Sequence, residues 1–224
     1  MIKAVIFDMD GTLIDTGSMA EVIWHRVGKS LGFSVERMCR IRDDCRGQSN
    51  KSACDYFAAK VPEIPFEEFS ALCAPEWTAE IERRGGIAQM RGAAELLAYL
   101  RENGYRIALA TSSGKETTAY RLRMSGLSDA FDAIVTGDTV ENGKPHPDIF
   151  LRAAEVLELH PSECMGVEDS FAGVEAISRA GMFTVMVPDM VEPTPEIEAM
   201  LDAKCETLCD IMPLLQHLNQ NGVN

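Results

Sequence analysis

The sequence predicts an α/β protein: a parallel sheet with helices on both faces, and an all-helical unit inserted near its start. Short apolar runs alternate with helical patterns over most of the chain, which is typical of a parallel sheet packed between helices. Between residues 15 and about 86 the alternation stops and only helical patterns remain. At 224 residues, the chain is long enough for one core domain that carries a smaller insertion.

Five short apolar runs predict the strands. Strands that are buried on both faces of a sheet are apolar throughout rather than alternating, and these runs have that character. The predicted strands are Lys3–Phe7, Ile107–Ala110, Ala133–Val135, Cys164–Val167 and Phe183–Val187.

Helical patterns separate the later strands. Their apolar residues recur every three or four positions, and a glycine that can end a helix follows three of them. The predicted helices are Ala93–Asn103, Thr117–Ser125, Pro147–Leu159 and Ala172–Ala180. A further one, at Leu208–Leu218, is expected to dock on the core.

The insertion begins with a clear amphipathic helix. Ile23, Val27 and Leu31 recur at every fourth position, so Met19–Leu31 is predicted to be helical. The Thr16-Gly17 and Gly85-Gly86 pairs are the expected linkers. The predicted domains are therefore a core of residues 1–14 and 87–224 and a helical insertion of residues 15–86. The other helices expected in it are Glu36–Asp44, Ser52–Lys60, Phe66–Cys73 and Pro75–Arg84.

The composition excludes several classes of protein. Asp and Glu number 35 against 21 Lys and Arg, so a net charge of −14 would repel nucleic acid and anionic membrane surfaces. No apolar run approaches the ~18 residues of a membrane-spanning helix. The seven cysteines are odd in number and lack CxxC spacing, which favours a reducing cytoplasm. We expect a cytoplasmic monomer or weak oligomer that acts on a small molecule.

Two aspartates, Asp8 and Asp10, follow the first predicted strand. Ligands bind at the carboxyl ends of parallel strands, so both carboxylates are expected at a binding site. Asp8 is ionised at neutral pH and could attack phosphorus without a base, forming an acyl-phosphate. Asp10 could protonate the leaving oxygen and later deprotonate water. The alternative is that the two aspartates only cap a turn.

Three more residues could hold a phosphate group. Thr111 and Ser112 follow the second predicted strand, where hydroxyls and free amides can bind phosphate oxygens or simply cap the next helix. Lys144 lies in a turn-rich loop before a predicted helix and could neutralise both the phosphate and the nucleophile. A loop lysine is more often only solvated, so this signal is weak alone.

An acidic pair, Glu168 and Asp169, ends the fourth predicted strand. Carboxylate oxygens are the ligands of hard cations, so the pair indicates a Mg²⁺ site, unless it only caps the next helix. The strand ends thus offer a nucleophile, phosphate donors, a cation and a metal site. That combination is what phosphoryl transfer requires.

These residues resemble the four motifs of the haloacid dehalogenase superfamily. Asp8–Thr12 is similar to the first motif, Thr111 to the second, Lys144 to the third and the Glu168-Asp169 pair to the fourth. The resemblance covers nearly the whole chain, and it is strongest to the group of β-phosphoglucomutase and small sugar-phosphate phosphatases. It implies a Rossmann-like core with a helical cap inserted after the first motif.

The resemblance also implies roles. Asp8 would be the nucleophile and Asp10 the acid/base, while Thr111, Ser112 and Lys144 would hold the phosphoryl group. Mg²⁺ would bind Asp8, the backbone carbonyl of Asp10 and Asp169, with Glu168 as a ligand or as a neighbour of the ligands.

The expected activity is a Mg²⁺-dependent phosphatase of small phosphorylated metabolites. An aspartate at position 10 favours phosphate esters over halides, since halide leaves without a proton. Two alternatives remain: a phosphosugar mutase, and a catalytically silent binding protein, which would be expected to lack Asp8 or Asp10. A mutase must hold a second phosphate, yet Ala20 and Cys73 stand where β-phosphoglucomutase has a histidine and a lysine, and only Lys51 offers a charge.

Overall fold

The computed structural model describes residues 1–45 and 50–221, which form two compact units. One unit is Met1–Asp15 together with Ala88–Asn224, and the other is Thr16–Ile87. The first contains the sheet and the second is helical. The predicted α/β class, with a parallel sheet and flanking helices, is confirmed.

Within the described residues the sheet has six strands in the order β3-β2-β1-β4-β5-β6, all parallel. The five predicted strands are present, and their ends differ from the predicted ones by at most one residue. The sixth, β6, was not predicted, because two residues are too few to show an apolar pattern. The strands are β1 (Ala4–Phe7), β2 (Arg106–Thr111), β3 (Ala133–Thr136), β4 (Cys164–Glu168), β5 (Phe183–Met186) and β6 (Ala203–Lys204).

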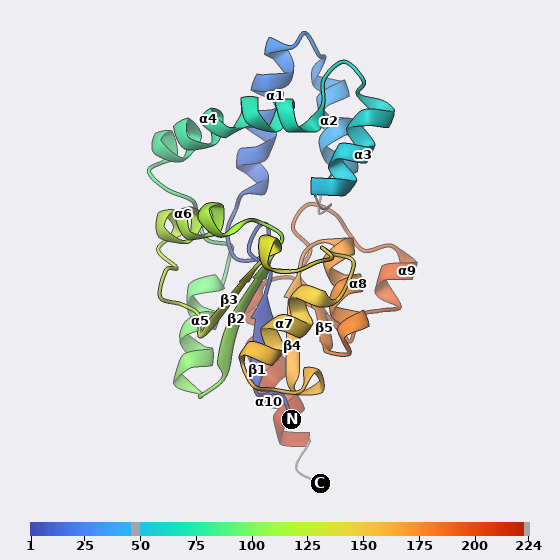
Figure 1. Ribbon diagram of the computed structural model, residues 1–224. Helices are drawn as coiled ribbons and strands as arrows, with labels where there is room; N and C mark the ends of the chain where they lie inside the picture. The colour runs from blue at the N-terminus through green and yellow to red at the C-terminus, as the bar shows by residue number, and fades with distance from the viewer. Residues whose placement is uncertain (46–49, 222–224) are drawn as a thin grey trace. The chain divides into compact units, whose positions relative to one another are not determined.

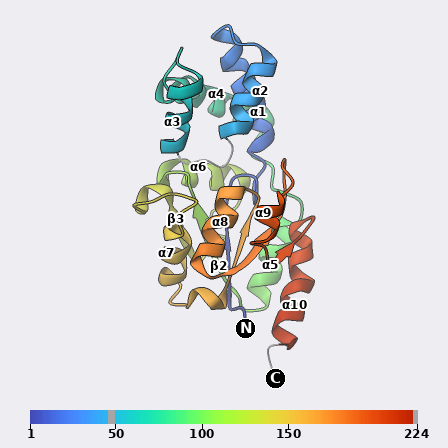
Figure 2. The same ribbon diagram turned by 90° about the vertical axis from the view of Figure 1, so that its right-hand side faces the viewer.

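Helices cover both faces of this sheet (Figure 1 and Figure 2). α7 and α8 lie on one face, whereas α5 and α10 lie on the other. Short 3₁₀ turns at Gly137–Thr139 (η1), Pro161–Glu163 (η2) and Leu208–Asp210 (η3) complete the connections. The helices are α5 (Ala93–Glu102), α6 (Lys115–Ser125), α7 (Asp148–Val156), α8 (Phe171–Ala180), α9 (Pro195–Glu198) and α10 (Ile211–Asn221).

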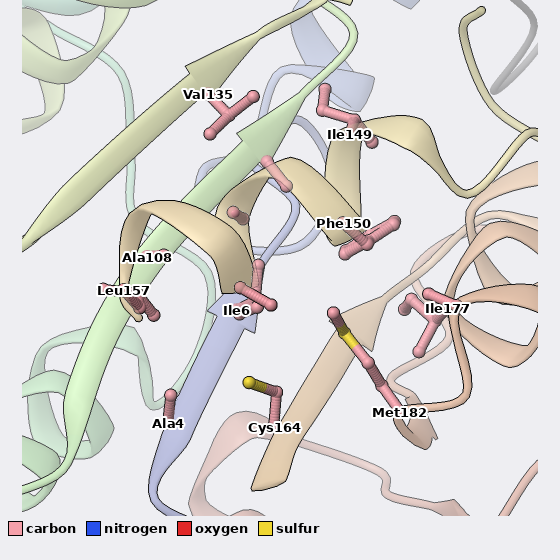
Figure 3. Packing of buried hydrophobic residues seen from close by; sticks show 14 of the residues in the cluster. Ala4, Ile6, Ala108, Val135, Ile149, Phe150, Leu157, Cys164, Ile177 and Met182 are labelled. Atoms are coloured by element: carbon pink, nitrogen blue, oxygen red, sulfur yellow. The ribbon is translucent and has the colours of Figure 1, made fainter. Parts of the chain in front are cut away.

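The core between the sheet and α7/α8 combines small strand residues with large helix residues (Figure 3). The strands contribute mainly alanine, as at Ala4 and Ala108, and the helices contribute Phe150 and Ile177. Gly166 of β4 is part of this fit, because a Cβ there would lie 2.5 Å from the Ile177 side chain. Small strand residues therefore let the helices pack closely and hold the carboxyl ends of the strands in place.

The helical unit contains α1 (Gly17–Ser30), α2 (Val35–Cys45), α3 (Asn50–Lys60) and α4 (Phe66–Arg84). The prediction of two helices on either side of residue 74 was wrong, since α4 continues through Pro75. A proline removes one helical hydrogen bond, but Phe69, Cys73 and Ile81 are buried on both sides of it. The packing of these side chains outweighs that loss and keeps the helix continuous.

No helix in residues 1–45 and 50–221 combines the length and the apolar character that crossing a membrane would need.

Candidate active site

The predicted site residues come mainly from three neighbouring strand ends. β1 lies between β2 and β4, so the segments that follow these strands meet at one edge of the sheet. Asp8 and Asp10 follow β1, Thr111 ends β2, and Glu168 ends β4. Lys144 joins them from the loop between η1 and α7. The topology alone therefore brings residues 8, 111 and 168 to the same edge.

A buried ion pair is at the centre of the site. The Lys144 ammonium lies 2.5 Å from Asp8 Oδ1 and 2.7 Å from Glu168 Oε1, and only 4% of Lys144 is exposed. Burial alone would lower the pKa of Lys144, but the charges of Asp8 and Glu168 outweigh burial and raise it. Lys144 is therefore a fixed positive charge beside the candidate nucleophile.

Glu168 is held on its other side by the backbone. Its Oε2 accepts hydrogen bonds from the amides of Asp169 (2.9 Å) and Ser170 (2.7 Å), just before α8. A Cβ on Gly173 would lie 1.8 Å from Glu168 Oε1, so only glycine fits at that position in the first turn of α8. Because both oxygens of Glu168 are engaged, this residue aims Lys144 at Asp8.

The carboxylates of Asp8, Glu168 and Asp169 form what we call the carboxylate cluster. Each offers an oxygen within 4.8 Å of the others. The Thr12 hydroxyl donates to Asp169 Oδ1 at 2.9 Å. Gly11 has φ +90°, and a Cβ there would lie 2.5 Å from Asp169 Oδ2, so glycine permits both the turn and the close approach.

The cluster carries more negative charge than its surroundings balance. Burial raises the pKa of Asp8 to about 7, with repulsion from Glu168 and Asp10 adding to it and Lys144 opposing it. Burial, Glu168 and Asp8 also raise the pKa of Asp169 well above its usual range. An all-oxygen donor set with excess negative charge fits a hard divalent cation such as Mg²⁺.

This charge imbalance predicts how pH acts on the metal-free protein. The folded-state pKa of Asp8 is raised from 3.8 to about 7, so between these values the folded protein holds a proton that the unfolded chain releases. Stability in EDTA should therefore fall as the pH rises from 5 to 8, by on the order of a few kcal/mol. Mg²⁺ should restore stability, and more at pH 8 than at pH 5, because its ligands must be deprotonated. Urea unfolding at both pH values, with EDTA or Mg²⁺, measures this; metal-free stability that rises with pH would contradict it.

Asp10 lies outside the carboxylate cluster. Its Oδ1 is 2.7 Å from the Arg121 guanidinium, and its Oδ2 accepts from the Ser113 hydroxyl at 3.0 Å. The side chain of Asp10 is thus held by α6 and the loop that precedes it. These two partners lie outside the group formed by Asp8, Lys144, Glu168 and Asp169.

The loop after β2 carries the two candidate phosphate ligands. Thr111 is buried and its hydroxyl accepts from the Ser113 amide at 3.1 Å, whereas Ser112 is exposed. A Cβ on Gly137 would lie 2.3 Å from the Ser112 carbonyl, so η1 packs closely beneath the loop. The side chain of Asp138 in η1 accepts from the Lys115 amide at the start of α6. Gly137 and Asp138 of η1 therefore hold the loop at Ser112 and at the point where it enters α6.

Sequence reasoning missed the supporting contacts of Thr12, Ser113 and Arg121. Thr12 lies within the first motif, and a hydroxyl two residues after Asp10 was a usable signal. Arg121 had no such signal, because its contact with Asp10 joins residues 111 positions apart.

The chain is similar in sequence and fold to known proteins of one family. The family model of haloacid dehalogenase-like hydrolases matches residues 2–181. β-Phosphoglucomutase of Bacillus subtilis is 33% identical over 189 residues, which cover 83% of each chain. A phosphorylated carbohydrates phosphatase of Thermotoga maritima is 30% identical over 229 residues, covering 97% of this chain and 99% of that one. The crystal structure of β-phosphoglucomutase from Clostridium difficile has a TM-score of 0.77 at 25% identity, and all of both chains is covered.

The family match covers more than half of the chain, and it includes every residue of the site described above. The parallel sheet with flanking helices is the fold of these relatives. The chain belongs to the haloacid dehalogenase-like hydrolase family.

Proposed function

We propose that this enzyme is a Mg²⁺-dependent phosphatase of small phosphorylated metabolites, with sugar phosphates as the substrate class. The observation that carries the proposal is the buried Asp8 carboxylate at the end of β1, 2.5 Å from Lys144 and within the carboxylate cluster. Relatives named as a carbohydrate phosphatase and a phosphoglucomutase support the substrate class.

The proposed reaction has two steps at phosphorus. An oxygen of Asp8 attacks the phosphorus atom, and the bond between phosphorus and the ester oxygen breaks. The ester oxygen takes a proton from Asp10 as it leaves. Asp10 then removes a proton from water, which attacks the same phosphorus atom and breaks its bond to Asp8. Inorganic phosphate leaves and Asp8 is regenerated. Lys144 offsets the charge that gathers when an anionic ester approaches an anionic nucleophile.

The loop after β2 supplies the remaining contacts to the phosphoryl group in this proposal. Thr111 and Ser112 offer hydroxyls and backbone amides near the start of α6, where a helix N-terminus favours anions. The anchoring of this loop by Gly137 and Asp138 supports the assignment, since a rigid loop holds its donors in position.

The resemblance to the family implies the metal ligands, and the hydrogen bonds of Glu168 decide its own role. We assign Asp8, Asp169 and the backbone carbonyl of Asp10 to Mg²⁺, which when bound would supply positive charge to attract and orient the phosphate. Sequence reasoning left Glu168 as a ligand or a neighbour of the ligands. Both of its oxygens accept hydrogen bonds, so we assign it to positioning Lys144.

A phosphosugar mutase is the second candidate, because B. subtilis β-phosphoglucomutase is 33% identical. The described residues weigh against it. Cys73 is a buried thiol, which carries no positive charge that could hold a second phosphate. Ala20 offers no polar group. The side chain of Lys51, the remaining candidate charge, lies outside the described residues.

A phosphate-release screen over hexose, pentose and nucleoside phosphates tests the proposal. We expect inorganic phosphate from sugar phosphates and little isomerisation of β-glucose 1-phosphate. Conversion to glucose 6-phosphate faster than phosphate release, with a bisphosphate primer present, would instead show a mutase. Binding of sugar phosphates without turnover would favour the catalytically silent alternative.

Removal of the metal should stop turnover. We expect full loss of phosphate release in EDTA, recovery with Mg²⁺ and inhibition by excess Ca²⁺. Ca²⁺ accepts more ligands than Mg²⁺ and could draw both oxygens of Asp8 into coordination, so that neither is free to attack. Unchanged activity in EDTA, after dialysis against the chelator, would remove the metal from the mechanism.

We also propose that the enzyme is cytoplasmic and is a monomer or a weak oligomer. All seven cysteines are free thiols, which agrees with a reducing compartment.

A further inference from the structure

We propose that Arg121 is a positioning residue for Asp10: together with Ser113 it fixes the carboxylate in the orientation that serves the leaving oxygen. The inference rests on the proposed function and deepens it. No sequence motif assigns Arg121 a role, and it is not among the groups that hold phosphate or metal in the account above.

The first observation is that both oxygens of Asp10 have a separate partner. Oδ1 lies 2.7 Å from Arg121 Nη1, and Oδ2 accepts from the Ser113 hydroxyl at 3.0 Å. Arg121 Nη1 is also 3.3 Å from the Ser113 hydroxyl, so the three side chains form a closed ring. Two contacts on different oxygens fix the rotation of the carboxylate, which one contact could not do.

The second observation is that the ring is largely shielded from solvent and that Arg121 belongs to a packed helix. The Arg121 side chain is 14% exposed and that of Asp10 is 27% exposed, so water screens the pair less than it screens a surface ion pair. Thr118 and Leu122 of α6 are buried beside Arg121, and the Thr118 hydroxyl donates to the Gly114 carbonyl. Arg121 therefore extends from a helix that is itself held in place.

The third observation is that Lys144 and Arg121 pair with different carboxylates of the site. Lys144 contacts Asp8 and Glu168, whereas Arg121 contacts Asp10. Asp10 is only two residues from Asp8, yet its side chain pairs with a different cation, Arg121, and with Ser113. Arg121 thus keeps the acid/base group apart from the nucleophile, in a fixed orientation. Proton transfer to a leaving oxygen depends on such an orientation.

The test compares two kinds of ester in the full enzyme with Mg²⁺. An alkyl ester, such as a hexose 6-phosphate, needs a proton on its leaving oxygen, whereas 4-nitrophenyl phosphate has a leaving group that departs largely without one. The quantity measured is kcat/KM, because it reports the steps up to the departure of the leaving group. The variants are Arg121→Gln, Arg121→Lys and, as a matched control, Arg123→Gln, which removes an exposed arginine from the same helix.

We expect Arg121→Gln to lower kcat/KM for the alkyl ester by roughly 10- to 100-fold and for the aryl ester by less than about threefold. For the alkyl ester, Arg121→Gln should lower kcat rather than raise KM. Arg121→Lys should recover part of this loss, and Arg123→Gln should match the wild type with both esters. A loss of folding would instead lower both esters equally and lower Tm, which thermal unfolding of each variant detects.

Equal losses for the two esters in a folded Arg121→Gln variant would overturn the inference and leave the proposed function intact. A rise in kcat/KM for the alkyl ester would also overturn the inference. The ion pair with Arg121 would then hold Asp10 in an orientation that does not protonate the leaving oxygen. Failure of the wild type to release phosphate from either ester would overturn the proposed function and, with it, the inference.

Discussion

Replacement of Asp8 by asparagine is expected to abolish phosphate release while the protein stays folded. The amide keeps the volume of the carboxylate but removes the charged oxygen that attacks phosphorus, so kcat should fall by roughly 10⁴-fold or more. The fold should survive, because burial already disfavours the charge of Asp8 and raises its pKa to about 7. Lys144 would keep its ion pair with Glu168.

Phosphate release and thermal unfolding of the same Asp8→Asn preparation check this expectation. The exposed Asp129 supplies the matched control, since Asp129→Asn makes the same chemical change far from the site. Its activity should equal that of the wild type. A folded Asp8→Asn variant that keeps a tenth of wild-type kcat or more would remove Asp8 from the role of nucleophile.

Replacement of Lys144 by methionine is expected to affect both stability and turnover. Methionine keeps most of the side-chain stem but leaves the buried charges of Asp8 and Glu168 without their cation, a change that destabilises proteins by about 3–5 kcal/mol. Turnover should be lost as well, because the nucleophile and the anionic ester then lack the fixed positive charge of Lys144. The stability deficit should shrink as the pH falls from 8 to 5, since Asp8, whose pKa burial raises to about 7, can then hold a proton.

Urea unfolding of Lys144→Met at pH 5 and pH 8 measures this effect. Lys29→Met is the control, because Lys29 is exposed in the last turn of α1 and belongs to the other compact unit. The control variant should have the same free energy of unfolding as the wild type at both pH values. A Lys144→Met variant as stable as the wild type at pH 8 would show that the ion pair does not carry the stability assigned to it.

The sequence predicted the strand ends well because their chemistry is local. Asp8 and the Glu168-Asp169 pair directly follow apolar runs, and strand order then brings β1 and β4 side by side. The position of Lys144 was harder to predict, since its loop shows no pattern that reveals where the ammonium lies. The residues alone gave a weak signal that Lys144 could neutralise the nucleophile, and the resemblance to a known family strengthened it.

The features that were missed depend on contacts that no local pattern records. α4 continues through Pro75 because buried residues on both sides hold the helix together. Arg121 reaches Asp10 because β2, its loop and α6 return the chain to β1, so the pair depends on topology rather than spacing. The engagement of both Glu168 oxygens likewise depends on a contact between distant parts of the chain, since Oε1 meets Lys144, 24 positions away.

In the proposed mechanism, Asp8 carries the phosphoryl group during turnover. Acid quenching during steady-state turnover of a sugar phosphate with Mg²⁺, followed by borohydride reduction, tests it most directly, because reduction converts an aspartyl-phosphate to homoserine. Peptide mass spectrometry should find homoserine at position 8, only when substrate and Mg²⁺ are both present, and none at Asp10 or Asp169. Homoserine at another aspartate, or phosphate release with no reducible intermediate under these conditions, would contradict the account.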